Sequence, residues 1–129
     1  MDVSELKQIP LFAEVPDEQL HKIAPFTSLT SAGEGKTVIR EGGYSNDFYA
    51  IQEGTVKVER DGEKLAELGP GDFFGEMGLL GDDRRNATVV ATSPMRLLTL
   101  DQWDMKRLEK AVPSAADKIR SAARSRGNA

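Results

Sequence analysis

The residues of this chain that could do chemistry gather in one glycine-rich stretch, PGDFFGEMGLLGDDRRNATV, at positions 70–89. Glycines let backbone N–H groups turn inward and approach a ligand closely. Glu76 follows Gly75, and a helical turn starting there would aim free N–H groups at an anion. Arg85 comes nine residues later, and its planar guanidinium suits phosphate oxygens. The stretch therefore predicts a cradle for one phosphate beside a carboxylate that accepts a hydrogen bond from a sugar hydroxyl.

Other residue types exclude several kinds of site. The chain has no cysteine and a single histidine, His21, so it cannot build a zinc site from thiolates or several imidazoles, or a histidine-based triad. His21 is expected on the surface of a short helix. The run GKT at 35–37 resembles the end of a phosphate-binding loop, but the motif needs a glycine where Thr30 stands. No metal, cofactor or catalytic residue is therefore expected, and the chain is not predicted to be an enzyme.

Length and composition indicate one globular domain. The chain has 129 residues, of which 39% are hydrophobic and 29% charged, so a single domain over residues 1–129 is expected. No apolar run approaches the roughly 18 residues of a membrane span. The polar start MDVSELKQIP does not resemble a secretory signal. A cytoplasmic location is the expectation.

Charge is spread unevenly along the chain. Residues 106–126 hold seven basic and two acidic residues, and since the whole chain has a net charge of −4, the rest of it carries −9. The acidic body argues against nucleic-acid binding by the domain as a whole. The basic tail is either a solvated helix face or a contact for an anion or an acidic partner.

Three zones are predicted along the chain. Residues 1–26 should be helical, with a second short helix opening at Pro16, which two acidic residues follow. Residues 27–100 should be β-structure, and residues 101–126 should be helical again. The apolar stripe that predicts the first helical part has its members three residues apart: Leu6, Ile9, Phe12 and Val15.

The middle zone shows short strands separated by turns. Alternation of β-branched and polar residues at 55–60 predicts a strand with one buried face, and Asp61-Gly62 is a two-residue hairpin signal. Strands this short with glycine-rich turns predict a mainly β fold with flanking helices, an antiparallel β-roll of the double-stranded jelly-roll kind. The predicted strands are 36–40, 48–51, 55–60, 63–68, 87–91 and 96–100.

The last zone contains two predicted helices. Asp101 is a suitable N-cap for the first, and three of the residues that follow are expected to face the roll: Trp103, Leu108 and Val112. Pro113 should interrupt the helix. Ser114 should cap the alanine-rich continuation, and Gly127 should end it.

The segment FGEMGLL followed by RRNATV resembles the phosphate-binding cassette of cyclic nucleotide-binding domains. Such domains occur in bacterial catabolite-activator regulators, protein kinase A regulatory subunits and cyclic nucleotide-gated channels. The resemblance extends over most of the chain. IPLFAEVPDEQLHKIAPF resembles the N-terminal helices of the family, VIREGGYSNDFYAIQEGTVKV its strands, and LLTLDQWDMKRLEKAVPSAADKI the helix after its roll.

The resemblance implies a role for each cassette residue. Glu76 would accept a hydrogen bond from the ribose 2′-hydroxyl, and Gly75 would let the sugar approach. The backbone N–H groups of Met77 and Gly78 would face the sugar and the cyclic phosphate. Arg85 would pair with the phosphate. The structural alternative is a salt bridge between Glu76 and Arg85 across a turn, which would gain little free energy at a surface and would not require the surrounding glycines.

The chain departs from the family pattern at two cassette positions. Arg84 stands where the family commonly has proline, and Asn86 stands where it has Ser, Thr or Ala. The N–H of Asn86 would assist Arg85 at the phosphate. In this family a threonine at the position of Asn86 is associated with cyclic GMP, so its absence favours cyclic AMP as the ligand. Arg126, or else Arg124, would stack on the base from the C-terminal helix as a cation–π partner.

The sequence thus predicts a regulatory sensor domain that binds a cyclic nucleotide, with cyclic AMP favoured over cyclic GMP. The ligand is expected to reposition the C-terminal helix and to signal to an effector domain or partner protein. The alternative is an interaction domain of the same fold that binds no nucleotide. Its hallmark would be loss of the glutamate or the arginine, and the chain has both Glu76 and Arg85.

Overall fold

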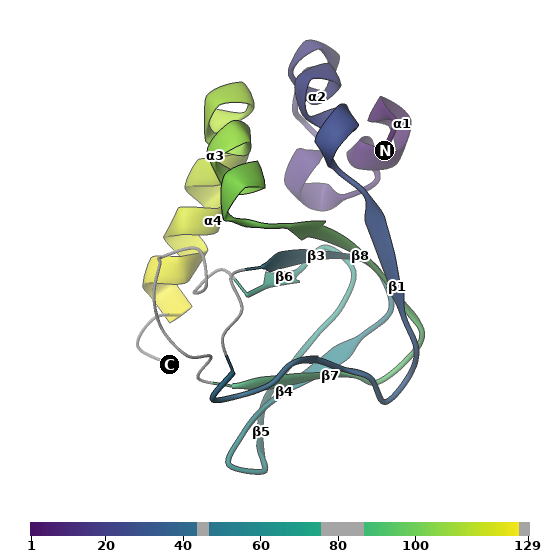
Figure 1. Cartoon of the computed structure of the whole chain (residues 1–129), viewed down its shortest axis with the longest axis vertical. Helices are drawn as coiled ribbons and strands as arrows, with labels where there is room; N and C mark the ends of the chain where they lie inside the picture. Colours follow the sequence, from purple (N-terminus) through teal and green to yellow (C-terminus); the bar gives the residue numbers. More distant parts are fainter. Residues whose placement is uncertain (44–46, 76–86, 127–129) are drawn as a thin grey trace.

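The computed structural model describes residues 1–43, 47–75 and 87–126, with side chains described as far as residue 121. Helices come first and last, and the strands lie between them (Figure 1). The elements are α1 (Val3–Lys7), η1 (Pro10–Phe12), α2 (Asp17–Ile23), η2 (Ala24–Phe26), β1 (Leu29–Ala32), β2 (Thr37–Ile39), β3 (Phe48–Glu53), β4 (Val56–Arg60), β5 (Glu63–Leu68), β6 (Phe73–Phe74), β7 (Thr88–Ala91), β8 (Met95–Leu100), α3 (Gln102–Ala111) and α4 (Pro113–Arg126).

The strands form two four-stranded sheets. One has the order β1-β8-β3-β6 and the other the order β2-β7-β4-β5, and the paired strands are antiparallel in both. Figure 1 shows the sheets facing each other, with the helices beyond the first sheet. The predicted order of helices, β-roll and helices is confirmed.

The central strands of the first sheet, β3 and β8, are buried on both faces, which explains why they are so apolar. In β8, Leu98 and Leu100 belong to the core shared with the helices, whereas Met95 and Leu97 belong to the core between the sheets. Alternate residues of a strand point to opposite faces. A strand covered on both sides must therefore be apolar at nearly every position.

The second sheet has one wet face, and its sequence alternates accordingly. In β4 Val56 is fully buried, while Lys57 and Glu59 form an ion pair with Nζ and Oε1 2.8 Å apart. The β4–β5 hairpin turns at Asp61 and Gly62, whose φ values are +53° and +80°. These values suit the two-residue turn predicted from the Asp-Gly pair.

The N-terminal helices pack as the stripe predicts, since all four of its members are buried. Asp2 caps α1 by accepting from the N–H of Glu5 at 2.8 Å. In α2, which begins at Asp17 after Pro16, Leu20 and Ile23 are fully buried. His21 is exposed on the same helix, as expected.

Two expectations for the C-terminal helices are wrong. Trp103 does not face the roll, because its side chain is 67% exposed. The buried residues of α3 are Met105 and Leu108, and a position two residues before Met105 lies on a different face of a helix. Ser114 does not start the last helix, since α4 begins at Pro113. Proline suits a first helical position because its missing N–H would be unbonded there.

Two strands, β1 and β6, lack a matching signal in the sequence. Two of the four residues of β1, Thr30 and Ser31, are polar and exposed, and β6 is only two residues long. Asp101 caps α3 as predicted, since its carboxylate accepts from the N–H of Asp104 at 2.8 Å. The predicted helix end at Gly127 lies outside the described residues. No described helix is both long and apolar enough to cross a membrane.

Candidate functional site

The structure describes the two ends of the predicted binding stretch. Its first end is β6 with Gly75, and its second end is residue 87 with β7. β6 belongs to one sheet and β7 to the other. Five predicted site residues lie outside the described part: Glu76, Met77, Gly78, Arg85 and Asn86. Arg126 is the last residue of α4, and the side chains of Arg124 and Arg126 are likewise outside the description.

The first end is held against β3 by aromatic contacts. Phe74 pairs with Tyr49 and Phe73 with Ala50 in the antiparallel ladder. The rings of Tyr49 and Phe74 stack with centroids 5.1 Å apart, and those of Phe48 and Phe73 lie 5.4 Å apart at a tilt of 46°. Aromatic pairs at these separations add stability beyond the area they bury. A strand of two residues is thereby fixed on the sheet edge.

Gly75 stands where two backbones approach closely. Its φ is +84°, a left-handed conformation that side chains disfavour. A Cβ built at Gly75 would lie 2.7 Å from the carbonyl oxygen of Asp47 and 3.5 Å from the Cα of Phe48. The resemblance assigns this glycine to contact with a sugar. The structure shows a second reason for it, because no other residue fits against the start of β3.

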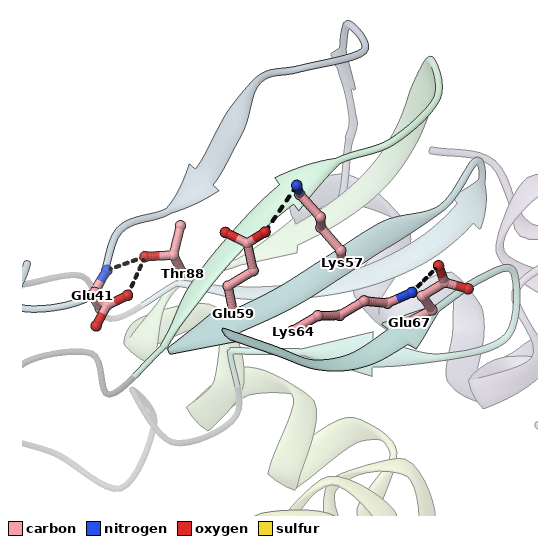
Figure 2. Close-up of polar contacts among 6 residues, drawn as sticks. All are labelled: Glu41, Lys57, Glu59, Lys64, Glu67 and Thr88. Carbon is pink, nitrogen blue, oxygen red and sulfur yellow. Dashed lines mark hydrogen bonds and ion pairs between the residues drawn. The ribbon is translucent and has the colours of Figure 1, made fainter. Parts of the chain in front are cut away.

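The second end is anchored by Glu41, just after β2. The N–H of Glu41 donates to Thr88 Oγ1 at 3.0 Å, and that hydroxyl donates back to Glu41 Oε1 at 3.1 Å. The N–H of Asp61, in the β4–β5 turn, donates to both carboxylate oxygens of Glu41 at 3.3 Å. Figure 2 shows the contact between Glu41 and Thr88 at the start of β7. One carboxylate thus joins the loop after β2, the hairpin turn and the strand that leaves the binding stretch.

The anchor at Glu41 was not predicted from the sequence. Its partners lie 20 and 47 residues away along the chain, so no local spacing reveals it. The two ion pairs in Figure 2, Lys57 with Glu59 and Lys64 with Glu67, lie on β4 and β5. They connect charges on the wet sheet and do not contact the anchor in the figure.

The carboxyl groups whose pKa values are shifted belong to neither end of the predicted binding stretch. The pKa of Asp104, in α3, is raised, chiefly because burial disfavours the charged carboxylate. The N–H of Glu5 lowers the pKa of Asp2, and hydrogen bonds from Lys7 and Lys64 lower those of Asp17 and Glu67 respectively. Helix caps, burial and surface pairs account for these pKa shifts. What the described part offers at the binding stretch is therefore positioning: a close backbone approach at Gly75 and a fixed strand start at Thr88.

Comparison with known proteins places this geometry in a family. The family model described as "Cyclic nucleotide-binding domain" matches residues 29–111. The chain is 35% identical over 114 residues to cGMP-dependent protein kinase, isozyme 1, of Drosophila melanogaster, covering 82% of the chain. It is 34% identical over 124 residues to the cAMP-dependent protein kinase regulatory subunit of Schizosaccharomyces pombe, covering 95% of the chain.

A solved structure supports the same placement. The catabolite activator protein of Thermus thermophilus superimposes with a TM-score of 0.79 at 29% identity, over 92% of this chain and 58% of that one. The chain spans only 15% of the length of the fly kinase and 29% of the yeast subunit. The match therefore concerns one module shared by larger proteins. By its family match, its relatives and its fold, the chain belongs to the cyclic nucleotide-binding domain family.

Proposed function

We propose that this chain is a regulatory sensor that binds a cyclic nucleotide, with cyclic AMP bound more tightly than cyclic GMP. The observation that carries the proposal is the family match over residues 29–111, which includes the whole stretch with Gly75, Glu76 and Arg85. The two described ends support it, because Gly75 directly follows β6 of one sheet and Thr88 begins β7 of the other. We assign the whole chain, residues 1–129, to this one domain.

The proposed contacts follow the cassette. Glu76 accepts from the ribose 2′-hydroxyl, and Arg85 forms a charge-assisted pair with the cyclic phosphate. The N–H groups of Met77, Gly78 and Asn86 complete the cradle. Gly75 permits the close approach of the sugar.

Preference for cyclic AMP rests on Asn86 alone. The fly kinase is named for cGMP and the yeast subunit for cAMP, and they are 35% and 34% identical to this chain. Overall similarity therefore does not separate the two ligands. Asn86 lacks the hydroxyl of the threonine that the family associates with cyclic GMP.

The proposed output is movement of α4. A ligand shifts a two-state equilibrium only by its difference in affinity for the two states. A contact between the base and Arg126, at the end of α4, would supply that difference through a cation–π interaction. The helix would then transmit binding to an effector domain or partner protein.

Calorimetric titration with cyclic AMP and then cyclic GMP tests the proposal. We expect saturable binding of both, tighter for cyclic AMP. Arg85→Ala should weaken it roughly 10- to 100-fold, since a charged phosphate pair contributes about 1.5–3 kcal/mol. Arg84→Ala is the matched control, because it removes an adjacent arginine that the proposal does not place on the phosphate.

The same titration distinguishes the sensor function from the alternative, an interaction domain that binds no nucleotide. Absence of binding by the wild-type domain, with an ordinary melting transition, would overturn the sensor function and favour an interaction domain of the same fold. Equal losses of affinity in Arg84→Ala and Arg85→Ala would still agree with cyclic-nucleotide binding by the wild-type domain. They would overturn the assignment of the phosphate to Arg85.

A further inference from the structure

The outer face of α3 carries an aromatic and basic stripe. We call Trp103, Lys106, Arg107 and Lys110 the α3 stripe; their spacing of three, one and three residues places them on one side of a helix. All four are exposed, and Trp103 has 67% of its side-chain surface in solvent. The opposite side of the helix is buried through Met105 and Leu108. The stripe therefore takes no part in the core.

The side chains of the stripe are held in place. The Lys106 ammonium nitrogen lies 4.7 Å from the centre of the Trp103 ring, and the Arg107 guanidinium carbon lies 5.5 Å from that of Phe26. Both distances are within the range of cation–π attraction. Arg107 also contacts Asp104 at 3.5 Å with its side chain 61% exposed. The surface is thus partly organised before any partner binds, which lowers the entropy cost of binding.

Much of the stripe's positive charge is uncompensated. Among the described residues, no carboxylate forms an ion pair with Lys106 or Lys110. Arg120, in α4, differs in this respect, because it pairs with both Glu109 and Asp117. An exposed tryptophan beside cations that lack a carboxylate partner gives the fold little stability, whereas Trp and Arg are enriched among the residues that contribute most to binding at protein interfaces.

We propose that the α3 stripe binds a short acidic segment of a partner protein that also carries an apolar side chain. The apolar group would cover Trp103, and carboxylates would pair with Lys106 and Lys110. From Trp103 to Lys110 the stripe rises about 10 Å, which an extended peptide spans in about three residues. Charge complementarity selects the acidic partner.

The surroundings disfavour the other anionic surfaces. Asp101 caps α3, Asp104 and Glu109 lie within it, and the chain as a whole carries −4. A nucleic acid or an anionic bilayer presents continuous negative charge, which would meet these carboxylates as well as the lysines. A short peptide can place its carboxylates only where the lysines are.

The test uses Trp103, which is the only tryptophan of the chain. The whole protein, without nucleotide, is titrated with the acetylated peptide Asp-Glu-Phe-Glu-Asp-Leu while tryptophan emission is recorded. We expect a saturable blue shift that weakens as salt rises from about 0.05 M to about 0.5 M, because salt screens exposed charges. The same peptide with glutamine and asparagine in place of its acids should bind at least tenfold more weakly.

Charge-reversal variants locate the site. Lys106→Glu with Lys110→Glu should weaken peptide binding by roughly tenfold or more, since two attractive pairs become repulsive. Lys36→Glu with Lys64→Glu is the matched control. It makes the same change in net charge at two exposed lysines near or within the second sheet, and should change binding by less than about twofold.

Four outcomes would overturn the proposal. They are equal binding of the neutral peptide, equal loss in the two double variants, an emission shift with phosphatidylserine vesicles but not with the peptide, and self-association by sedimentation that Lys106→Glu with Lys110→Glu abolishes. The last two would assign the stripe to a lipid surface or a second copy. Because nucleotide is left out, none of them bears on the proposed sensor function.

Discussion

At the scale of single residues, Gly75 controls how the binding stretch leaves β6. We expect Gly75→Ala to lower the free energy of unfolding by about 2–4 kcal/mol, from left-handed strain and from the clash with Asp47. Gly62→Ala is the control, since Gly62 has a similar φ of +80° but open space around its Cβ position. It should cost only about 1 kcal/mol. Urea unfolding measures both, and equal losses would show that the approach to Asp47 does not matter.

A second residue-scale prediction concerns pH. Burial raises the pKa of Asp104 above its ordinary value of 3.8, and its side chain is 19% exposed. A raised pKa means that the folded state disfavours the charged form, so this group's contribution to stability is lost as pH rises through the raised pKa. Asn cannot ionise but can still accept the hydrogen bond from the N–H of Asp101. We therefore expect the stability of Asp104→Asn, relative to wild type, to increase from pH 3 to pH 7.

Thermal melts of both proteins at several pH values measure that difference. Asp2, Asp17 and Glu67 have lowered pKa values, so they lose stability as pH falls. They are the same in both proteins and cancel. A difference that stays flat or shrinks with rising pH would contradict the assignment.

At the scale of elements, Glu41 joins three segments that are distant in sequence. Glu41→Ala removes acceptors for Thr88 Oγ1 and the Asp61 N–H, and should lower the free energy of unfolding by about 1–2 kcal/mol. Glu34→Ala, at an exposed glutamate between β1 and β2, should change it by less than about 0.5 kcal/mol. Chemical unfolding compares them. Similar values would mean that the anchor does not stabilise the start of β7.

Elements were predictable where the pattern is local. Alternation in β4 and the Asp-Gly turn predicted a hairpin, and the hairpin forms. The sequence does not predict β6 as a strand, because two phenylalanines are too few to show a periodicity. The position of β6 depends on its pairing with β3. The prediction for Trp103 is wrong because apolar character alone does not determine burial, and Met105 and Leu108 set the buried face of α3.

In the candidate site, too, some features can be predicted from the sequence and others cannot. Glycine as a residue type predicts close approach in this stretch, and the resemblance assigns Gly75 to the sugar; the close approach that the structure describes is to the backbone of Asp47 and Phe48. Glu41 was not predicted, because its role depends on contacts between distant segments. The roles of Glu76 and Arg85 stay predictions.

At the scale of the whole molecule, α4 shares a core with the N-terminal helices. Ala115, Ala116 and Ile119 are at most 1% exposed and belong to the same cluster as Leu6 and Phe12. Moving α4 alone would open this cluster and leave cavities, which cost stability. We therefore expect the N-terminal helices to move with α4 when nucleotide binds.

Hydrogen exchange with and without cyclic AMP measures this coupling. Protection should change in α1 and α2 as well as in α4, while the β4–β5 hairpin serves as an internal reference that stays constant. A change confined to α4 would show that the last helix moves independently of the core it shares.

Ligand binding should also be visible in the stability of the whole domain. A ligand that binds only the folded state stabilises it by about 2.7 kcal/mol at 100 times its Kd. For a domain of this size that corresponds to a rise in Tm of about 10 °C. We expect cyclic AMP to produce this rise in wild type and in Arg84→Ala, and Arg85→Ala to show at most about half of it at the same concentration. Because unfolding of the whole chain is observed, a cooperative shift would mean that binding energy reaches both sheets and the helices. A wild-type Tm that does not move at millimolar cyclic AMP or cyclic GMP would count against the sensor function, whatever the cassette sequence suggests.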